Sequence, residues 1–183
     1  MSEDPRVPPV TAREQLPGDQ RHHFDAIEAS RGGVRGPFTV LLHSPELAGR
    51  VGHLGAFVRY ESDVPDALRE LTILATAYEW ACAYEWTAHE PIAREAGVSE
   101  AAIDAVLDDS PTDGLSELEA TVVRYVRELL RTHDVMEATY RAAEDRFGPR
   151  GAVELTATVG YYSMLACVLN ALRVLPDEPV PPF

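Results

Sequence analysis

Three side chains with acid, base or nucleophilic chemistry stand close together in the middle of the sequence. Cys82, Glu85 and His89 lie in an apolar, helix-forming stretch, and Trp86 lies between them. On an α-helix the spacing i, i+3, i+4 and i+7 places all four residues on one face, with Glu85 and His89 in side-chain reach. A carboxylate beside an imidazole can hold and transfer a proton, and a thiolate is a nucleophile.

A fourth candidate, Glu70, precedes Glu85 by fifteen positions. That separation is about 22 Å along a straight helix at 1.5 Å per residue. From the loop at Pro65 to Ala96 only Pro91 interrupts the helical pattern, so the pattern alone indicates one very long helix. Glu70 can therefore join the other candidates only if the chain breaks and folds back.

These residues also have ordinary structural interpretations. A glutamate and a histidine four residues apart are often a surface pair that contributes a few tenths of a kcal/mol. A lone cysteine is often a small buried apolar residue, and Cys167, inside an apolar run, is predicted to lie in the core. The five other histidines share no metal-ligand spacing and are expected to be structural or exposed.

Composition limits the possible partners. The chain has 183 residues, a net charge of −14 and sixteen basic residues, all of them arginine. This charge repels phosphate, so nucleic acid and anionic membranes are poor partners. Two distant cysteines form no disulfide framework, and no leader or membrane-spanning run is recognisable. We expect a cytoplasmic protein that binds neither nucleic acid nor membranes.

The elements that must position these residues are helical, because strand alternation is nowhere sustained. Asp63 or Asp66 is expected to cap the central helix, Gly97 to end it, and Ser116 with Glu119 to form a capping box. The predicted division is an extended arm over 1–20, a helical domain over 21–175 and a proline-rich tail over 176–183. Besides the central helix, helices are expected over 19–30, 45–60, 99–108, 116–131, a segment ending at 147, and 150–172.

The motifs resemble a known superfamily. The runs Arg69-Glu70-Leu-x-Ile-Leu, Cys82-x-Tyr-Glu85-Trp-x-x-His89 and Ala93-x-x-Ala96-Gly97-Val98-Ser99 are similar to the core of the carboxymuconolactone decarboxylase and alkylhydroperoxidase-D superfamily. The resemblance implies an alkylhydroperoxidase-D-like bundle of about seven to nine helices that forms a dimer, trimer or hexamer. It also implies a break near Trp80 to Ala83 that returns Glu70 to the second half of the motif.

The resemblance implies Glu70, Cys82, Glu85 and His89 as catalytic residues. The peroxidase branch has a glutamate, a Cys-x-x-Cys pair and a histidine, but Glu85 stands here at the second cysteine. The decarboxylase branch has a glutamate four residues before the histidine, but a basic residue where this chain has Cys82. Three aromatic residues are expected to line the pocket: Tyr84, Trp86 and Tyr161.

Three functions remain open at this stage. The first is cofactor-free decarboxylation or isomerisation of a small carbonyl or lactone acid, with His89 as the acid, Glu85 orienting its ring and Glu70 as base. Arg59, Arg69 or Arg94 would then anchor the substrate carboxylate. The second is a peroxidase that uses Cys82 with Cys167 or an external thiol. The third is a binding or scaffold protein without catalysis.

Overall fold

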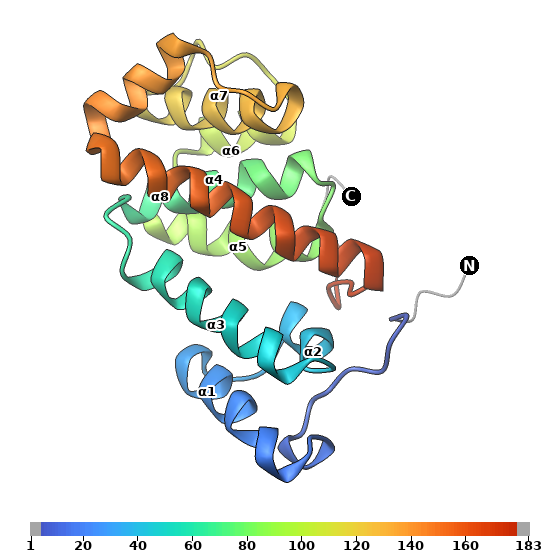
Figure 1. Cartoon of the computed structure of the whole chain (residues 1–183). Coiled ribbons are helices and arrows are strands. Elements are labelled where there is room, and N and C mark those ends of the chain that lie inside the picture. The colour runs from blue at the N-terminus through green and yellow to red at the C-terminus, as the bar shows by residue number, and fades with distance from the viewer. Residues whose placement is uncertain (1–4, 179–183) are drawn as a thin grey trace. The chain divides into compact units, whose positions relative to one another are not determined.

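The computed structural model describes residues 5–178, and within that range all regular secondary structure is helical (Figure 1). The prediction of an all-α fold is therefore confirmed, and the eight α-helices fall within the expected number. Two short 3-10 helices, Arg13–Gln15 and Gly18–Gln20, precede them. The α-helices are α1 (Arg21–Arg31), α2 (Pro37–Leu41), α3 (Pro45–Tyr60), α4 (Asp66–Glu79), α5 (Ala83–Ala96), α6 (Glu100–Leu107), α7 (Glu117–Thr132) and α8 (Glu137–Leu172).

The chain divides into two compact units. The first holds the residues up to Glu61 together with Cys167–Leu175, and the second holds Ser62–Ala166 with the residues from Pro176. In the first unit α1 and α2 pack on α3. The described part of the predicted N-terminal arm is hydrogen-bonded within this unit, since the Arg6 amide donates to the Leu172 carbonyl at 2.8 Å. Residues 1–4 and 179–183, the outer ends of the predicted arm and tail, lie outside the described residues.

Helix α4 is the centre of the second unit. It packs against α5, α6 and α7, and every residue from Leu68 to Ala77 is buried. Each fully buried leucine or isoleucine contributes about 1.5–3 kcal/mol of hydrophobic stabilisation. Because this stretch also contains Arg69 and Glu70, the same packing places two charged side chains inside the protein. The core around α4 includes Leu71, Leu74, Trp86, Ile103, Val122, Val126, Leu155 and Val159.

The break between α4 and α5 confirms the fold-back that the resemblance implies. The Cys82 amide donates to the Ala77 carbonyl at 2.9 Å, and the Ala81 amide donates to the Tyr78 carbonyl at 2.9 Å. This pair of hydrogen bonds is the Schellman ending of a helix, which requires a left-handed residue, usually glycine, between them. Ala81 takes that position with a φ of 45°. An alanine therefore ends α4 where no glycine or proline is available.

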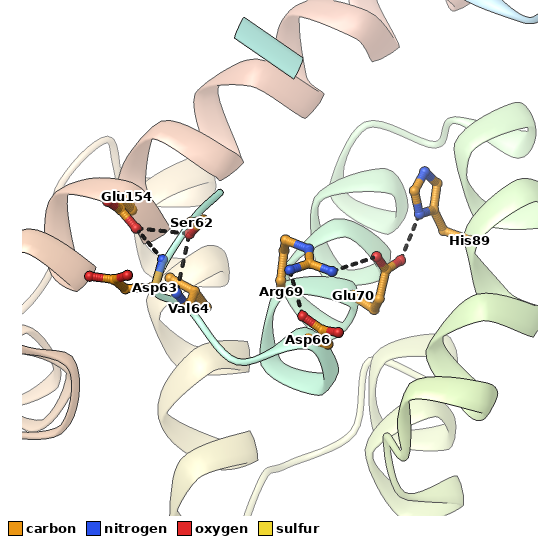
Figure 2. Close-up of polar contacts among 8 residues, drawn as sticks. All are labelled: Ser62, Asp63, Val64, Asp66, Arg69, Glu70, His89 and Glu154. Carbon is orange, nitrogen blue, oxygen red and sulfur yellow. Dashed lines mark hydrogen bonds and ion pairs between the residues drawn. The ribbon is translucent and has the colours of Figure 1, made fainter. Parts of the chain in front are cut away.

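The loop before α4 is held differently from the expectation. Pro65 precedes the helix, and neither Asp63 nor Asp66 caps it. Instead, the buried carboxylate of Glu154 on α8 accepts hydrogen bonds from the Ser62 hydroxyl at 2.9 Å and the Asp63 amide at 2.7 Å (Figure 2). Arg150 also donates to Glu154, at 2.7 Å. Glu154 thus fixes the segment from which α4 starts.

The predicted ends of several other helices are confirmed. Ser116 and Glu119 form the capping box of α7, and Glu119 also accepts the Ser99 amide at 3.0 Å. Gly97 ends α5 in the left-handed conformation. Gly148 interrupts α8 with a φ of 68° and a ψ of 175°, so the predicted break before Pro149 is present inside a helix that otherwise continues.

Helix α8 corrects one expectation. Cys167 is exposed rather than in the core, because the buried face of the helix runs through Tyr162, Leu165, Ala166 and Leu169 and leaves position 167 on the other side. By length and apolarity alone α8 could span a membrane, with a mean hydropathy of 1.4 over its most apolar window. However, 56% of that window is buried within the protein, as in the core helix of a soluble fold.

We predict that Ala81→Gly stabilises the protein by about 1 kcal/mol, because glycine adopts a positive φ without the steric cost that alanine has. Urea denaturation measures the change. Gly97→Ala is the matched control, since Gly97 occupies the same position at the end of α5 with a φ of 92° and open space around it. It should destabilise by a similar amount. A destabilising Ala81→Gly change would contradict the strain at Ala81.

A second prediction concerns acid stability. Burial raises the pKa of the Glu154 carboxyl, but hydrogen bonds from Arg150, Asp63 and Ser62 outweigh it, so the net pKa is lowered from 4.5. The ionised carboxylate therefore stabilises the fold above about pH 4.5, and this contribution is lost as the pH falls through the lowered value. Glu154→Gln should cost about 1–3 kcal/mol at pH 7.

The difference in unfolding free energy between the wild type and Glu154→Gln should become smaller as the pH falls. Denaturation between pH 7 and pH 3 measures it. The exposed Glu95 provides a matched control. Glu95→Gln should change stability by no more than about 0.5 kcal/mol at either pH. A Glu154→Gln deficit that stays constant with pH would argue against an ionised, hydrogen-bonded Glu154.

Candidate active site

Two of the predicted site residues, Glu70 and His89, share a buried hydrogen bond. Glu70 lies on α4 with 2% of its surface exposed, and His89 lies on α5 with 5% exposed. The Glu70 Oε2 atom is 2.7 Å from the His89 Nδ1 atom (Figure 2). The break after α4 makes this contact possible, because it returns α5 along α4. The distance problem posed by the sequence is thereby resolved.

Glu85 approaches the other nitrogen of the same ring. Its Oε2 atom is 3.5 Å from His89 Nε2, and both side chains are buried. A neutral imidazole has one N–H donor, whereas an imidazolium has two. A protonated His89 can therefore donate toward both carboxylates, and a neutral His89 toward one. These three side chains form a compact group among which a proton can be exchanged.

Arg69 provides the positive charge beside this group. Its Nη1 atom donates to Asp66 Oδ1 at 2.8 Å, and its Nη2 atom lies 3.8 Å from Glu70 Oε1 (Figure 2). The residue is only 8% exposed. A buried carboxylate needs a nearby cation or donors to offset its desolvation, and Glu70 has both, from Arg69 and His89. The sequence offered Arg69 only as one of three possible anchors.

The other two candidate anchors are less buried than Arg69. Arg94, on α5, is paired with Glu90 and Glu100, and 40% of its side chain is exposed. Arg59 belongs to α3 in the first unit. Of the three arginines proposed from the sequence, Arg69 alone is buried beside Glu70.

Cys82 occupies the N-cap position of α5 and is fully buried. The buried side chains that follow it on α5 are Glu85, Trp86, His89 and Ala93. The stripe that the sequence predicted is therefore the inward face of this helix. Cys82 lies one turn before Glu85 on that face, with its thiol closed to solvent.

Tyr162 contacts the His89 ring, and the expectation that Tyr84, Trp86 and Tyr161 line a pocket stays a prediction. The ring of Tyr162 on α8 meets the His89 ring edge-on, with centroids 5.2 Å apart and planes at 88°. Tyr161, which was expected to line the pocket, packs against Tyr162 at 5.3 Å. Trp86 lies in the core against Tyr78, and Tyr84 is half-buried. The neighbouring tyrosines were visible in the sequence, but which of them contacts His89 depends on the rotation of α8.

The second unit also contains a pocket of about 320 Å³ at the start of α4. Its lining includes Pro65, Leu68, Gly97, Glu119 and Arg146, but none of the predicted catalytic residues. Over residues 5–178, no three His, Cys, Asp or Glu side chains are grouped so as to hold a metal ion. The expectation of chemistry without a metal or cofactor stays a prediction.

We predict that Glu70→Ala destabilises the protein by about 1–3 kcal/mol, because it leaves the buried Nδ1–H of His89 without its acceptor. The ¹⁵N spectrum of the imidazoles, with His89→Gln used for assignment, should show a changed Nδ1 signal in Glu70→Ala. Glu85→Gln should retain the Nδ1–H, since it leaves Glu70 in place. An unchanged Nδ1 signal in Glu70→Ala would disprove the hydrogen bond.

Comparisons with known proteins agree with this geometry. The sequence model of the carboxymuconolactone decarboxylase family matches residues 45–128, a range that includes all four predicted catalytic residues. A search of curated proteins gave no match.

Solved structures show the same fold. An alkylhydroperoxidase AhpD core protein from Ralstonia eutropha, described as an uncharacterized peroxidase-related protein, superposes with a TM-score of 0.75 and 21% identity, covering 95% of this chain and 93% of that one. An uncharacterized peroxidase-related protein from Silicibacter has a TM-score of 0.70 and 16% identity, with coverages of 96% and 95%. An Agrobacterium tumefaciens protein of unknown function has a TM-score of 0.66 and 19% identity, with coverages of 79% and 100%. The match at residues 45–128 shows that this segment is similar to the carboxymuconolactone decarboxylase family, and the solved structures show that the chain has the fold of the alkylhydroperoxidase AhpD core.

Proposed function

We propose that this protein is a carboxymuconolactone decarboxylase-like enzyme that moves protons without a cofactor, in the decarboxylation or isomerisation of a small carbonyl or lactone acid. The observation that supports it is the buried His89 ring, which has a carboxylate at each nitrogen, at 2.7 Å and 3.5 Å. An acid and a base held this close, away from water, are what such reactions require.

The chemistry assigns a task to each group. Loss of carbon dioxide from an acid conjugated to a carbonyl leaves its electron pair on carbon as an enolate, and one proton must then be added to that carbon. The Nε2–H of His89 is the donor in this proposal, and solvent restores its proton afterwards. Isomerisation uses the same groups, with one carboxylate removing a proton from carbon before His89 returns one elsewhere.

The two glutamates take roles opposite to those expected from the sequence. Glu70 makes the short contact to Nδ1, so we assign it the task of holding the ring and its tautomer, as a carboxylate does behind a catalytic histidine. Glu85 makes the longer contact, 3.5 Å to Nε2, on the opposite side of the ring from Glu70. We therefore assign Glu85 the role of base and proton carrier.

Thiol-dependent peroxidase activity is the second candidate. The N-terminus of α5, where Cys82 lies, favours a thiolate, and two of the similar structures are described as peroxidase-related. Against it, the thiol is fully buried, and Glu85 stands where a resolving cysteine would be. The remaining candidates for the resolving thiol are Cys167, which belongs to the first unit, and an external thiol.

A non-catalytic binding or scaffold role is the third candidate. We also propose a cytoplasmic homo-oligomer, whether dimer, trimer or hexamer, which sedimentation at moderate salt can distinguish. Exposed apolar side chains support association, since a copy of the chain could cover them. These side chains are Leu47, Leu54, Tyr60, Met136 and Val153.

The proposed chemistry predicts deuterium incorporation from solvent. The protein, incubated in D₂O with β-keto acids and γ-butenolide carboxylic acids, should add deuterium at the α-carbon of a substrate, as read by NMR. His89→Gln should slow the exchange by about 100-fold or more, because it removes the proton donor. Cys82→Ser should keep the rate within about threefold, since the thiol takes no part in the proposed proton transfer.

A hydroperoxide assay separates the alternatives. Consumption of hydroperoxide that Cys82→Ser abolishes, together with no deuterium exchange, would replace the proposal with thiol chemistry. If the protein neither exchanges deuterium nor consumes hydroperoxide, the scaffold role is favoured instead.

A further inference from the structure

One edge of the Arg69 guanidinium makes no hydrogen bond within the described chain. The Nε atom is buried and has no hydrogen-bond partner among residues 5–178. The neighbouring Nη2 atom lies 3.8 Å from Glu70 Oε1, beyond hydrogen-bond distance, whereas Nη1 donates to Asp66. Nε and Nη2 form the side-on edge of a guanidinium, which matches the two oxygens of a carboxylate.

Pairing with Glu70 does not explain why the Nε atom on this edge has no acceptor. A role limited to balancing the charge of Glu70 would account for a cation at this position. It would not account for a buried N–H donor without an acceptor, which costs about 1–3 kcal/mol. Within the second unit, no other described arginine has a buried side-chain nitrogen in this state. The Nε of Arg31, in the first unit, is in the same state, so Arg69 is distinguished by its position beside Glu70.

Arg69 is also well placed relative to the proton-transfer group. Glu70 directs Oε1 toward Arg69 and Oε2 toward His89, so a single side chain separates the guanidinium from the imidazole (Figure 2). Asp66 holds Nη1 from the solvent side, with 79% of its side chain exposed. An acid held on the free edge of Arg69 would thus have its neighbouring carbon atoms near His89.

We infer that Arg69 anchors the substrate through one carboxylate, bound side-on by Nε and Nη2, and that the preferred substrates are small monocarboxylates. This inference rests on the proposed function and adds the binding group and the charge class. The charges around the site support it. Three carboxylates, those of Asp66, Glu70 and Glu85, already lie against Arg69 and His89, so a second substrate carboxylate would add negative charge to this group.

Ligand-observed NMR titrations of the full-length protein test the inference with three probes of similar size. Crotonate carries one carboxylate, crotonamide carries none, and fumarate carries two. The wild type should bind crotonate about tenfold more tightly than crotonamide, and fumarate no more tightly than crotonate. Equal affinities for crotonate and crotonamide, or tighter binding of fumarate, would overturn the inference.

Variants of Arg69 test whether this residue causes the preference for crotonate over crotonamide. Arg69→Gln should weaken crotonate binding by about tenfold and leave crotonamide binding nearly unchanged. Arg69→Lys keeps the charge but not the planar edge, and should recover only part of the affinity. Arg94→Gln is the matched control and should bind all three probes as the wild type does. A crotonate preference that survives Arg69→Gln would refute the anchor.

Two further measurements keep the outcomes separate. Thermal melting checks the fold of each variant, and Arg69→Lys, which keeps the charge, supplies the comparison if Arg69→Gln does not fold. Arg69-dependent crotonate binding without deuterium exchange would sustain the anchor and reject the proposed function. Deuterium exchange that is unaffected by Arg69→Gln would reject the anchor and sustain the proposed function.

Discussion

The hydrogen bond between Glu70 and His89 is the contact on which the second unit depends. Helix α4 is buried from Leu68 to Ala77, and an ionised carboxylate inside a protein costs several kcal/mol unless charges and donors meet it. His89 can meet Glu70 only if α5 returns along α4. The Schellman ending at Ala81, the position of Cys82 and the inward stripe of α5 all follow from that requirement.

Burial of these charged side chains costs desolvation free energy, and it also strengthens the interactions between them. In a medium of lower effective dielectric, the interactions among Arg69, Glu70, Glu85 and His89 are stronger than in water. These groups stand on two packed helices rather than on loops, so their spacing is set by the core. Glu154 adds to this rigidity, because it ties the segment before α4 to α8.

Glu85 stands where the peroxidase branch that the sequence resembles has its second cysteine. A second cysteine at this position would pair with Cys82 in thiol–disulfide exchange, which transfers electrons. A carboxylate cannot take part in that exchange, and here it lies 3.5 Å from His89 Nε2, where it can bind or transfer a proton.

Local patterns in the sequence determined the helical class, the capping box at Ser116, the end of α5 at Gly97 and the buried stripe from Cys82 to His89. These features depend on interactions within one or two turns, which the order of residues specifies directly. The break after α4 followed only from the family resemblance, because no glycine or proline marks it. Only the tertiary structure decided that Tyr162 contacts His89, that Cys167 is exposed, and that Arg69 keeps an unpaired donor beside Glu70. Each of these depends on how helices distant in sequence are rotated against one another, and that rotation is set by the packing of the whole core.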